Sequence, residues 1–453
     1  MQAELVVRSR WIVPVHPSTL LEDHALAIGD GRILALLPGT EAERSIECSH
    51  WVDLSNHLLI PGLVNAHTHA AMTLMRGYAD DLPLDRWLQK RIWPTEAHHL
   101  SEEFVRDGTL AAAAEMLAGG ITTFGDMYFF PAAAIEAATQ LGIRIVAGLV
   151  VIGFPSAYAP TPGEYLERGL ETRDAWSGHP LVSFMLAPHA PYSVDTATLA
   201  RIAAYAGETG LAVQTHLHET PAEVQADLDE YHRRPLARLD QLGLVTPGLC
   251  AVHMTQVNDE DLALLARHAV NVVHCPESNL KLASGFCPVA HLQAAGINIA
   301  LGTDGAASNN DLDMIGEMRT AALLAKGVAG DPAAFDARKA LTAATLGGAR
   351  ALGLETEIGS LEVGKWADLT ALDFSANALH PLYDPLSQLV YSAGRGAVSE
   401  VWVAGRQRLS RGRILDHDSA ALARRLDAWE TRLKEDKEEI GHLKCKTATG
   451  CPP

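Results

Sequence analysis

The chain has few cysteines, and their spacing is not that of a paired set. Its 453 residues include six cysteines, which are scattered and form no C-x-x-C pair. This spacing argues against a cysteine zinc site and against a disulfide framework. The opening segment MQAELVVRSRWIVPVHP lacks a basic stretch followed by a long apolar run, so we expect no signal peptide and a cytoplasmic protein. We assign no function to Cys445 and Cys451 near the C-terminus.

Long apolar runs and an excess of positive charge are also absent. The most apolar stretch, residues 145–154, is too short to span a bilayer. With 36 Lys and Arg against 55 Asp and Glu, the formal net charge is −19. Nucleic acids and anionic membrane surfaces are bound by clustered basic side chains, so we expect neither as a partner. Hydrophobic residues make up 48% of the chain, which is ample for a large core.

Apolar segments of strand length alternate with helical patterns through the middle of the chain. This alternation predicts βαβ units and a parallel sheet. We expect helices over residues 101–120 and 196–210, among others. Eight such units predict an α/β protein with a (β/α)8 barrel. The eight candidate strands are residues 59–67, 120–127, 143–150, 181–189, 211–218, 249–254, 270–275 and 297–304.

Shorter β-rich segments occupy both ends of the chain. Asp30 and Gly31 form a typical hairpin turn between two apolar segments. Residues 359–373 and 397–415 also have the pattern of hairpins with glycine turns. A charged helix followed by a polar tail is expected from residue 417 to residue 453.

Histidine and acidic residues recur where the predicted barrel strands end. His67 and His69 are two residues apart, so strand geometry directs both side chains to the same face. Active sites of such barrels lie at the C-terminal ends of the strands. A single histidine at a strand end is more often structural, but recurrence on several strands favours a metal site. The other candidates are His189, His216, His218, Glu219, His253, His274 and Asp304.

The order of these motifs resembles the amidohydrolase superfamily. NAHTH, THLHET, AVH and LGTDG carry the resemblance. The segments HTHAAMTLMRGYADDLPLDRWLQKRIWPTE, APHAPYS and HCPESNLKLASG are most similar to the 5-methylthioadenosine/S-adenosylhomocysteine deaminases. The resemblance implies a small β-sandwich from residues 1–58 and 357–416, a catalytic barrel over residues 59–356, and a C-terminal segment over 417–453.

The resemblance also implies one divalent metal. Relatives with two metals use a bridging carboxylated lysine, and here no lysine lies between Lys90 and Lys281. Zinc is the metal expected, although iron, manganese and cobalt also bind imidazole and carboxylate ligands. The implied ligands are His67, His69, His216 and Asp304.

The roles of the remaining residues follow from the same resemblance. Glu219 is the expected general acid/base, which protonates the ring nitrogen and moves a proton to the leaving amine. Asp304 also accepts a proton from the attacking water, and His253 stabilises the developing tetrahedral centre. His218 and His274 are expected to be structural. The expected substrate contacts are Glu96 to the ribose hydroxyls, His189, Glu219, Trp87 and Asn279.

These assignments predict a deaminase of adenine nucleoside thioethers. Residues 145–167 contain no arginine or lysine that could bind a substrate carboxylate. We therefore expect 5′-methylthioadenosine to be preferred over S-adenosylhomocysteine. The alternatives are a guanine, 8-oxoguanine or other aminoheterocycle deaminase, a triazine hydrolase, or a non-catalytic scaffold. Related barrels are often dimers or tetramers, so a homo-oligomer is expected.

Overall fold

The computed structural model describes the backbone of residues 1–448 and the side chains of residues 1–435. The expected polar tail and Cys451 lie outside the described residues, and Cys445 lies outside the described side chains. Eight parallel strands, β5 to β12, follow one another around a barrel in sequence order, as predicted. They are β5 (Leu63–Thr68), β6 (Ile121–Asp126), β7 (Arg144–Val151), β8 (Val182–Pro188), β9 (Val213–Leu217), β10 (Leu249–His253), β11 (Asn271–His274) and β12 (Asn298–Leu301).

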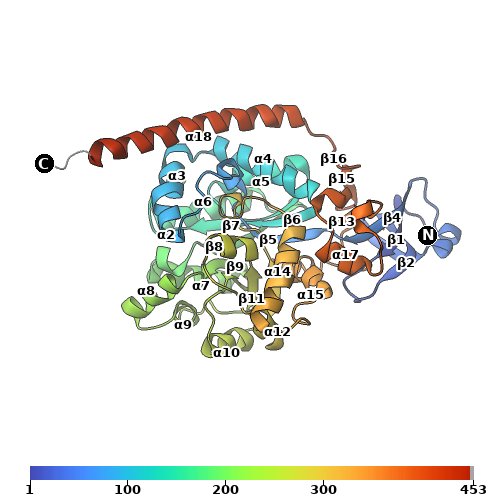
Figure 1. The fold of residues 1–453 in the computed structure, drawn as a ribbon, viewed down its shortest axis with the longest axis horizontal. Helices are drawn as coiled ribbons and strands as arrows, with labels where there is room; N and C mark the ends of the chain where they lie inside the picture. The colour runs from blue at the N-terminus through green and yellow to red at the C-terminus, as the bar shows by residue number, and fades with distance from the viewer. Residues whose placement is uncertain (449–453) are drawn as a thin grey trace.

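The last and first barrel strands meet at the ends that carry the candidate metal ligands. The backbone N–H of Asp304 donates to the carbonyl of His67 at 3.0 Å. Most barrel strands are buried along their whole length, because helices cover the barrel from outside (Figure 1). The longer of these helices are α4 (Glu102–Ala118), α5 (Pro131–Leu141), α6 (Pro162–Ala175), α7 (Thr196–Thr209), α8 (Pro221–Tyr231), α10 (Asp259–Arg267) and α14 (Met314–Ala329).

Several of these helices begin where a side chain caps the first turn. Ser101, Asp195 and Thr220 each accept a hydrogen bond from the backbone three residues later. The expected helices over 101–120 and 196–210 are confirmed as α4 and α7. Short helices fill the connections: α1 (Gly39–Ser45), η1 (Ala70–Met75), α2 (Leu84–Trp87), η2 (Leu88–Ile92), α3 (Trp93–His99), η3 (Pro191–Ser193), α9 (Pro235–Gln241), α11 (Pro276–Lys281), α12 (Val289–Ala294), α13 (Ala306–Asn309), α15 (Ala337–Ala343), α16 (Leu346–Ala351), η4 (Asn377–Leu379), α17 (Pro385–Tyr391) and η5 (Arg395–Ala397).

A second, mixed sheet joins the two ends of the chain beside the barrel (Figure 1). Its strand order is β16-β15-β14-β13-β4-β1-β2-β3. Side chains alternate between its two faces: Leu5 and Val7 belong to one apolar cluster and Val6 to another. The strands are β1 (Leu5–Ile12), β2 (Leu21–Gly29), β3 (Arg32–Pro38), β4 (Trp51–Pro61), β13 (Leu369–Asp373), β14 (Val398–Val403), β15 (Arg406–Ser410) and β16 (Arg413–Ile414).

Two of the local predictions for this region are confirmed. Asp30 and Gly31 connect β2 to β3 with φ angles of 50° and 73°, which is the positive pair that a tight hairpin turn requires. Residues 397–415 form the expected hairpins of β14, β15 and β16.

Two other local predictions are wrong. The strand expected over residues 59–67 is two strands, because β4 continues to Pro61 in the mixed sheet and β5 begins at Leu63 in the barrel. Gly62 lies between them, where a Cβ atom would come within 2.1 Å of the Thr122 hydroxyl. Residues 359–373 do not form a hairpin, because β13 pairs with β4 and β14 instead.

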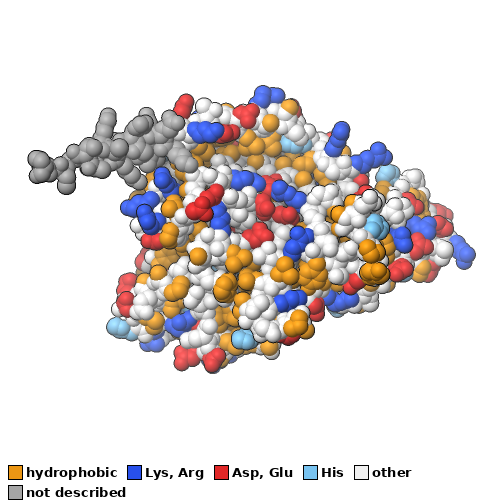
Figure 2. Space-filling model, in the orientation of Figure 1, with side chains coloured by type: hydrophobic (Ala, Val, Ile, Leu, Met, Phe, Trp, Pro, Cys, Tyr) orange, Lys and Arg blue, Asp and Glu red, His pale blue; other side chains and the backbone are white. Residues whose placement is uncertain are grey.

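The long helix α18 (Ser419–Ala448) lies against α4 on the outside of the barrel (Figure 1). Trp429 is buried, and its indole N–H donates to Asp107 of α4 at 3.0 Å. Arg425 donates to the other oxygen of the same carboxylate at 2.9 Å. In the part of the chain that the structure describes, no helix is long and apolar enough to cross a membrane. Figure 2 shows acidic and basic side chains interspersed on one face of the molecule, with no continuous basic patch there.

Candidate metal centre and catalytic site

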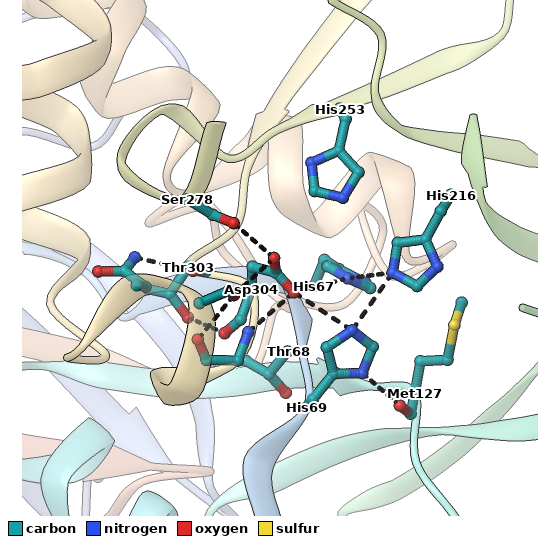
Figure 3. Close-up of polar contacts among 12 residues, drawn as sticks. His67, Thr68, His69, Met127, His216, His253, Ser278, Thr303 and Asp304 are labelled. Carbon is teal, nitrogen blue, oxygen red and sulfur yellow. Dashed lines mark hydrogen bonds and ion pairs between the residues drawn. The ribbon is translucent and has the colours of Figure 1, made fainter. Parts of the chain in front are cut away.

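Four side chains from three barrel strand ends converge on one point (Figure 3). His67 belongs to β5 and His69 follows it, His216 belongs to β9, and Asp304 follows β12. Nε2 of His216 lies 3.2 Å from Nε2 of His67 and 3.2 Å from Nε2 of His69. Oδ1 of Asp304 lies 3.5 Å from Nε2 of His67 and 3.2 Å from Nε2 of His69. The four donor atoms therefore surround a small common centre.

These separations fit a divalent metal. Zinc bonds nitrogen and oxygen ligands at about 2.0–2.2 Å, so the ligands of a tetrahedral site lie roughly 3.3–3.5 Å apart. Three imidazoles and one carboxylate form a donor set that zinc, iron, manganese and cobalt all bind. The predicted metal-binding cluster is confirmed for all four ligands.

The far nitrogen of each imidazole makes a hydrogen bond that determines its tautomer. Nδ1 of His67 lies 2.7 Å from Oε1 of Gln214, and Nδ1 of His69 lies 2.6 Å from the Met127 carbonyl. Nδ1 of His216 lies 2.7 Å from the carbonyl of His189. All three partners are oxygen acceptors, so each Nδ1 carries the proton. Each Nε2 therefore presents a lone pair to the centre, which is the form that binds a metal.

Asp304 is held by hydrogen bonds to both carboxylate oxygens. Oδ1 accepts the backbone N–H of Gly305 at 2.8 Å, and Oδ2 accepts the hydroxyls of Ser278 at 2.6 Å and Ser308 at 2.8 Å. Burial alone would raise the pKa of this carboxyl. When the rings of His67 and His69 are protonated at Nε2, their contacts with Oδ1 outweigh burial and hold the pKa of Asp304 well below its ordinary value. The side chain is therefore an anionic ligand.

Glu219 lies beside the centre on the loop after β9. Its carboxylate accepts the hydroxyl of Ser284 at 3.2 Å, and its second oxygen lies 3.7 Å from Nε2 of His253. Burial, followed by the charge of Asp304, raises the pKa of Glu219 to about 8. A carboxyl with this pKa can both donate and accept a proton near neutral pH. Nδ1 of His253 lies 2.8 Å from Oδ1 of Asn279, which fixes the ring.

One cavity opens onto this group of residues. Glu96, His189, Glu219 and Trp87 line it together with the metal ligands His69, His216 and Asp304. Its other walls are mostly apolar and aromatic, and the described lining includes no arginine or lysine. The remaining polar groups of the lining belong to Tyr128, Tyr192, His253 and Ser308. Burial raises the pKa of Glu96 to about 7, although the Tyr128 hydroxyl opposes the shift. The apolar wall residues are Met72, Leu84, Leu88, Trp93, Met127, Phe129, Val150, Ile152 and Leu282.

The comparisons with known proteins agree with this site. The model of the amidohydrolase family matches residues 58–408. The chain belongs to the amidohydrolase family. It is 48% identical to the 5-methylthioadenosine/S-adenosylhomocysteine deaminase of Teredinibacter turnerae, over 93% of this chain and 96% of the relative. It is 44% identical to the enzyme of the same name from Saccharophagus degradans, over 96% of this chain and 98% of the relative.

A solved structure supports the same family and a bound metal. An adenosine deaminase from Xanthomonas campestris with bound zinc is 50% identical, with a TM-score of 0.95. The alignment covers 96% of this chain and 99% of that chain. The zinc of this relative agrees with the ligand set found here. The chain therefore has the amidohydrolase fold and is a metal-dependent hydrolase that acts on C–N bonds.

The structure places most of the other sequence-predicted residues of this amidohydrolase around the cavity. Asn279 is not among the described residues that line the cavity. Its Oδ1 lies 2.8 Å from Nδ1 of His253 instead. His218 has a positive φ of 52°, and its Nε2 accepts the backbone N–H of Leu236, so it faces away from the metal site. His274 is buried in the barrel, and burial lowers its pKa to about 3.

Several supporting residues were not predicted from the sequence. Gln214 orients His67, and its position two residues before His216 on β9 places both on one strand face. Glu223 accepts the backbone N–H groups of His218 at 3.1 Å and Glu219 at 2.7 Å. The capping-box spacing from Thr220 to Glu223 is the signal that could have revealed Glu223. Ser278, Ser284, Ser308 and Tyr128 carry no comparable signal.

Proposed function

We propose that the protein deaminates adenine nucleoside thioethers hydrolytically, with 5′-methylthioadenosine as the preferred substrate. The observation that carries the proposal is the shared cavity: a protonatable Glu219 beside the metal centre, and Glu96 in the wall of the same space. The names of the two bacterial relatives and of the zinc-containing structure support the same reaction class.

Each catalytic side chain has a definite task in this reaction. A metal held by the four ligands supplies a water of lowered pKa at neutral pH. Glu219 in its protonated form donates to the ring nitrogen next to the amino-bearing carbon, which makes that carbon electrophilic. Asp304 accepts the proton that the attacking hydroxyl releases. Glu219, left ionised by the first transfer, passes this proton on to the amine, the C–N bond breaks and ammonia leaves. The next water restores the proton of Glu219. His253, fixed by Asn279, stabilises the charge that develops at the tetrahedral centre.

The substrate contacts follow from the cavity walls. Glu96 can accept hydrogen bonds from the vicinal ribose hydroxyls, and His189 lies where it can contact the base or the sugar. Trp87 is buried and contributes an aromatic wall. A carboxylate-bearing tail would enter an apolar space without an arginine partner in the described lining, which costs binding energy. A methylthio group fits the same walls without that cost.

A substrate panel tests the proposal. We would measure ammonia release from 5′-methylthioadenosine, S-adenosylhomocysteine, adenosine, guanine and a chlorinated triazine, using zinc-loaded protein and a Glu219→Gln variant. The expected result is the highest kcat/KM for 5′-methylthioadenosine and a loss of about 10²–10⁴-fold in the variant, with its metal content unchanged. Equal kcat/KM for the first two substrates would contradict the preference. Turnover of guanine or triazine alone would contradict the nucleoside substrate.

The homo-oligomer, the cytoplasmic location and the division into residues 1–58, 59–356, 357–416 and 417–453 stay predictions. The mixed sheet extends to Pro61, so β4 crosses the first of these limits. Gel filtration with light scattering would give the oligomeric state directly.

A further inference from the structure

Three consecutive residues after β6 each contact a different part of the site. The carbonyl of Met127 accepts Nδ1–H of the metal ligand His69 at 2.6 Å. The hydroxyl of Tyr128 donates to Oε1 of Glu96 at 2.6 Å. Phe129 contributes its ring to the apolar wall of the cavity. One short backbone segment thus connects the reaction centre to the residue proposed to bind ribose.

Packing fixes the Tyr128 side chain. Only 3% of it is exposed, and its ring meets that of Phe129 edge to face with centroids 5.3 Å apart. The centroid of the His69 ring lies 6.4 Å from that of Tyr128. Because this ring has little freedom to move, its hydroxyl is a donor in a fixed position.

The contact between Tyr128 and Glu96 selects one orientation of the carboxylate. Glu96 is 7% exposed, so a wrongly turned carboxylate could not exchange its lost partner for bulk water. A phenol donates a single proton, which occupies one lone pair of Oε1. The other carboxylate oxygen stays available to a ligand in the cavity that Glu96 lines. A pair of vicinal hydroxyls is a ligand of matching chemistry.

We propose that Tyr128 is a positioning residue that holds Glu96 ready for the ribose diol and so makes the site selective for ribonucleosides over dideoxynucleosides. This inference rests on the proposed function. Tyr128 acts through Glu96 and not by contact with the sugar. The binding free energy that favours the diol arises because the carboxylate is already oriented when the diol binds.

A substrate-by-variant comparison tests the inference. We would measure kcat and KM of wild type and Tyr128→Phe with adenosine and with 2′,3′-dideoxyadenosine. The expected result is a rise in KM of about tenfold for adenosine, as for loss of a hydrogen bond to a charged group, and no change for the dideoxy compound. Metal content should stay at the wild-type value. Equal losses on both nucleosides, or none on either, would overturn the inference.

Two further variants keep the test specific. Tyr158→Phe is the matched control, because Tyr158 is a buried tyrosine outside the cavity lining whose hydroxyl has no hydrogen-bond partner among the described residues. It should leave the kinetics of both nucleosides unchanged. Adding Tyr128→Phe to Glu96→Gln should cause no further loss on adenosine, and an additional tenfold loss would overturn action through Glu96. Wild-type protein that deaminates neither of these nucleosides nor 5′-methylthioadenosine would instead contradict the proposed function itself.

Discussion

Nδ1 of His67 donates a hydrogen bond to Oε1 of Gln214, 2.7 Å away across the barrel interior. The amide of Gln214 cannot turn freely, because its nitrogen donates to the carbonyl of Ala66 at 2.9 Å. The pair therefore fixes both the tautomer and the ring orientation of a metal ligand. Gln214 is fully buried, so water cannot replace the lost acceptor.

The first prediction follows from this pair. Gln214→Leu should weaken zinc binding by about 10–100-fold, because His67 loses the acceptor that keeps its Nε2 unprotonated and directed at the centre. Competition with a chromophoric chelator measures the affinity. Gln225→Leu is the control, since Gln225 lies on the exposed side of α8 and contacts only Asp229 in the described hydrogen bonds. Equal zinc affinity of wild type and Gln214→Leu would contradict the role of this contact.

The second prediction concerns Glu223. Its buried carboxylate binds two successive backbone N–H groups of the loop that carries Glu219. Glu223→Leu removes both acceptors, and we expect kcat to fall at least about tenfold through misplacement of Glu219. Zinc affinity should change little, because Glu223 touches no metal ligand. Glu230→Leu, near the end of the same helix, is the control. A variant that loses zinc and activity in parallel would show that Glu223 supports the whole site instead.

The third prediction is a pH dependence of stability. Burial, followed by the charge of Glu277, raises the pKa of Glu317 well above its ordinary value. The folded protein therefore keeps a proton that the unfolded chain releases above about pH 4.5. The contribution of this protonated carboxyl to the free energy of unfolding is fully present below that pH. It is lost as the pH rises toward the pKa of Glu317 in the folded protein.

Urea unfolding of wild type and Glu317→Gln at pH 5 and pH 8 checks the sign. The variant has no such proton to lose. Its free energy of unfolding should therefore rise relative to that of wild type as the pH rises. The gain should be about 1.4 kcal/mol for each pH unit inside the window. An unchanged difference between the two proteins at pH 5 and pH 8 would contradict the assignment.

The fourth prediction concerns the attachment of α18. Trp429→Ala should lower the free energy of unfolding by about 3–5 kcal/mol, because it opens a cavity against Phe104 and leaves Asp107 without its indole donor. Differential scanning calorimetry measures the loss, and Trp51→Ala is a control at a tryptophan that is 37% exposed. We expect kcat of the folded variant to be unchanged, since Trp429 is not part of the cavity lining. A loss no larger than that of the control would contradict tight docking of the helix.

The sequence predicts the barrel and the metal ligands well, for a physical reason. Strands of a barrel are buried apolar runs, and their C-terminal ends meet in one place, so histidines at those ends must converge. This rule gives His67 and His69 together with seven other candidates at the strand ends, and the resemblance to the amidohydrolases selects His216 and Asp304 among them. The break at Gly62 does not follow from this rule, because the apolar run continues from the end of β4 into β5, and only the structure shows that the two strands belong to different sheets.

The supporting contacts are the part that sequence reasoning misses. Tyr128 meets Glu96 across 32 residues of chain, and Gln214 meets His67 across 147. Such contacts depend on how strands and loops are placed in space, and no local pattern encodes them. Asn279 illustrates the same limit: its motif indicates a role in the site, but only the structure shows that its partner is His253.

Incorporation of water oxygen tests the central claim most directly. We would incubate zinc-loaded protein with 5′-methylthioadenosine in oxygen-18 water and analyse the nucleoside by mass spectrometry. Hydrolytic deamination predicts 5′-methylthioinosine that carries one heavy oxygen at the former amino position, together with one equivalent of ammonia. Unchanged nucleoside, or a deaminated product without the label, would contradict the account.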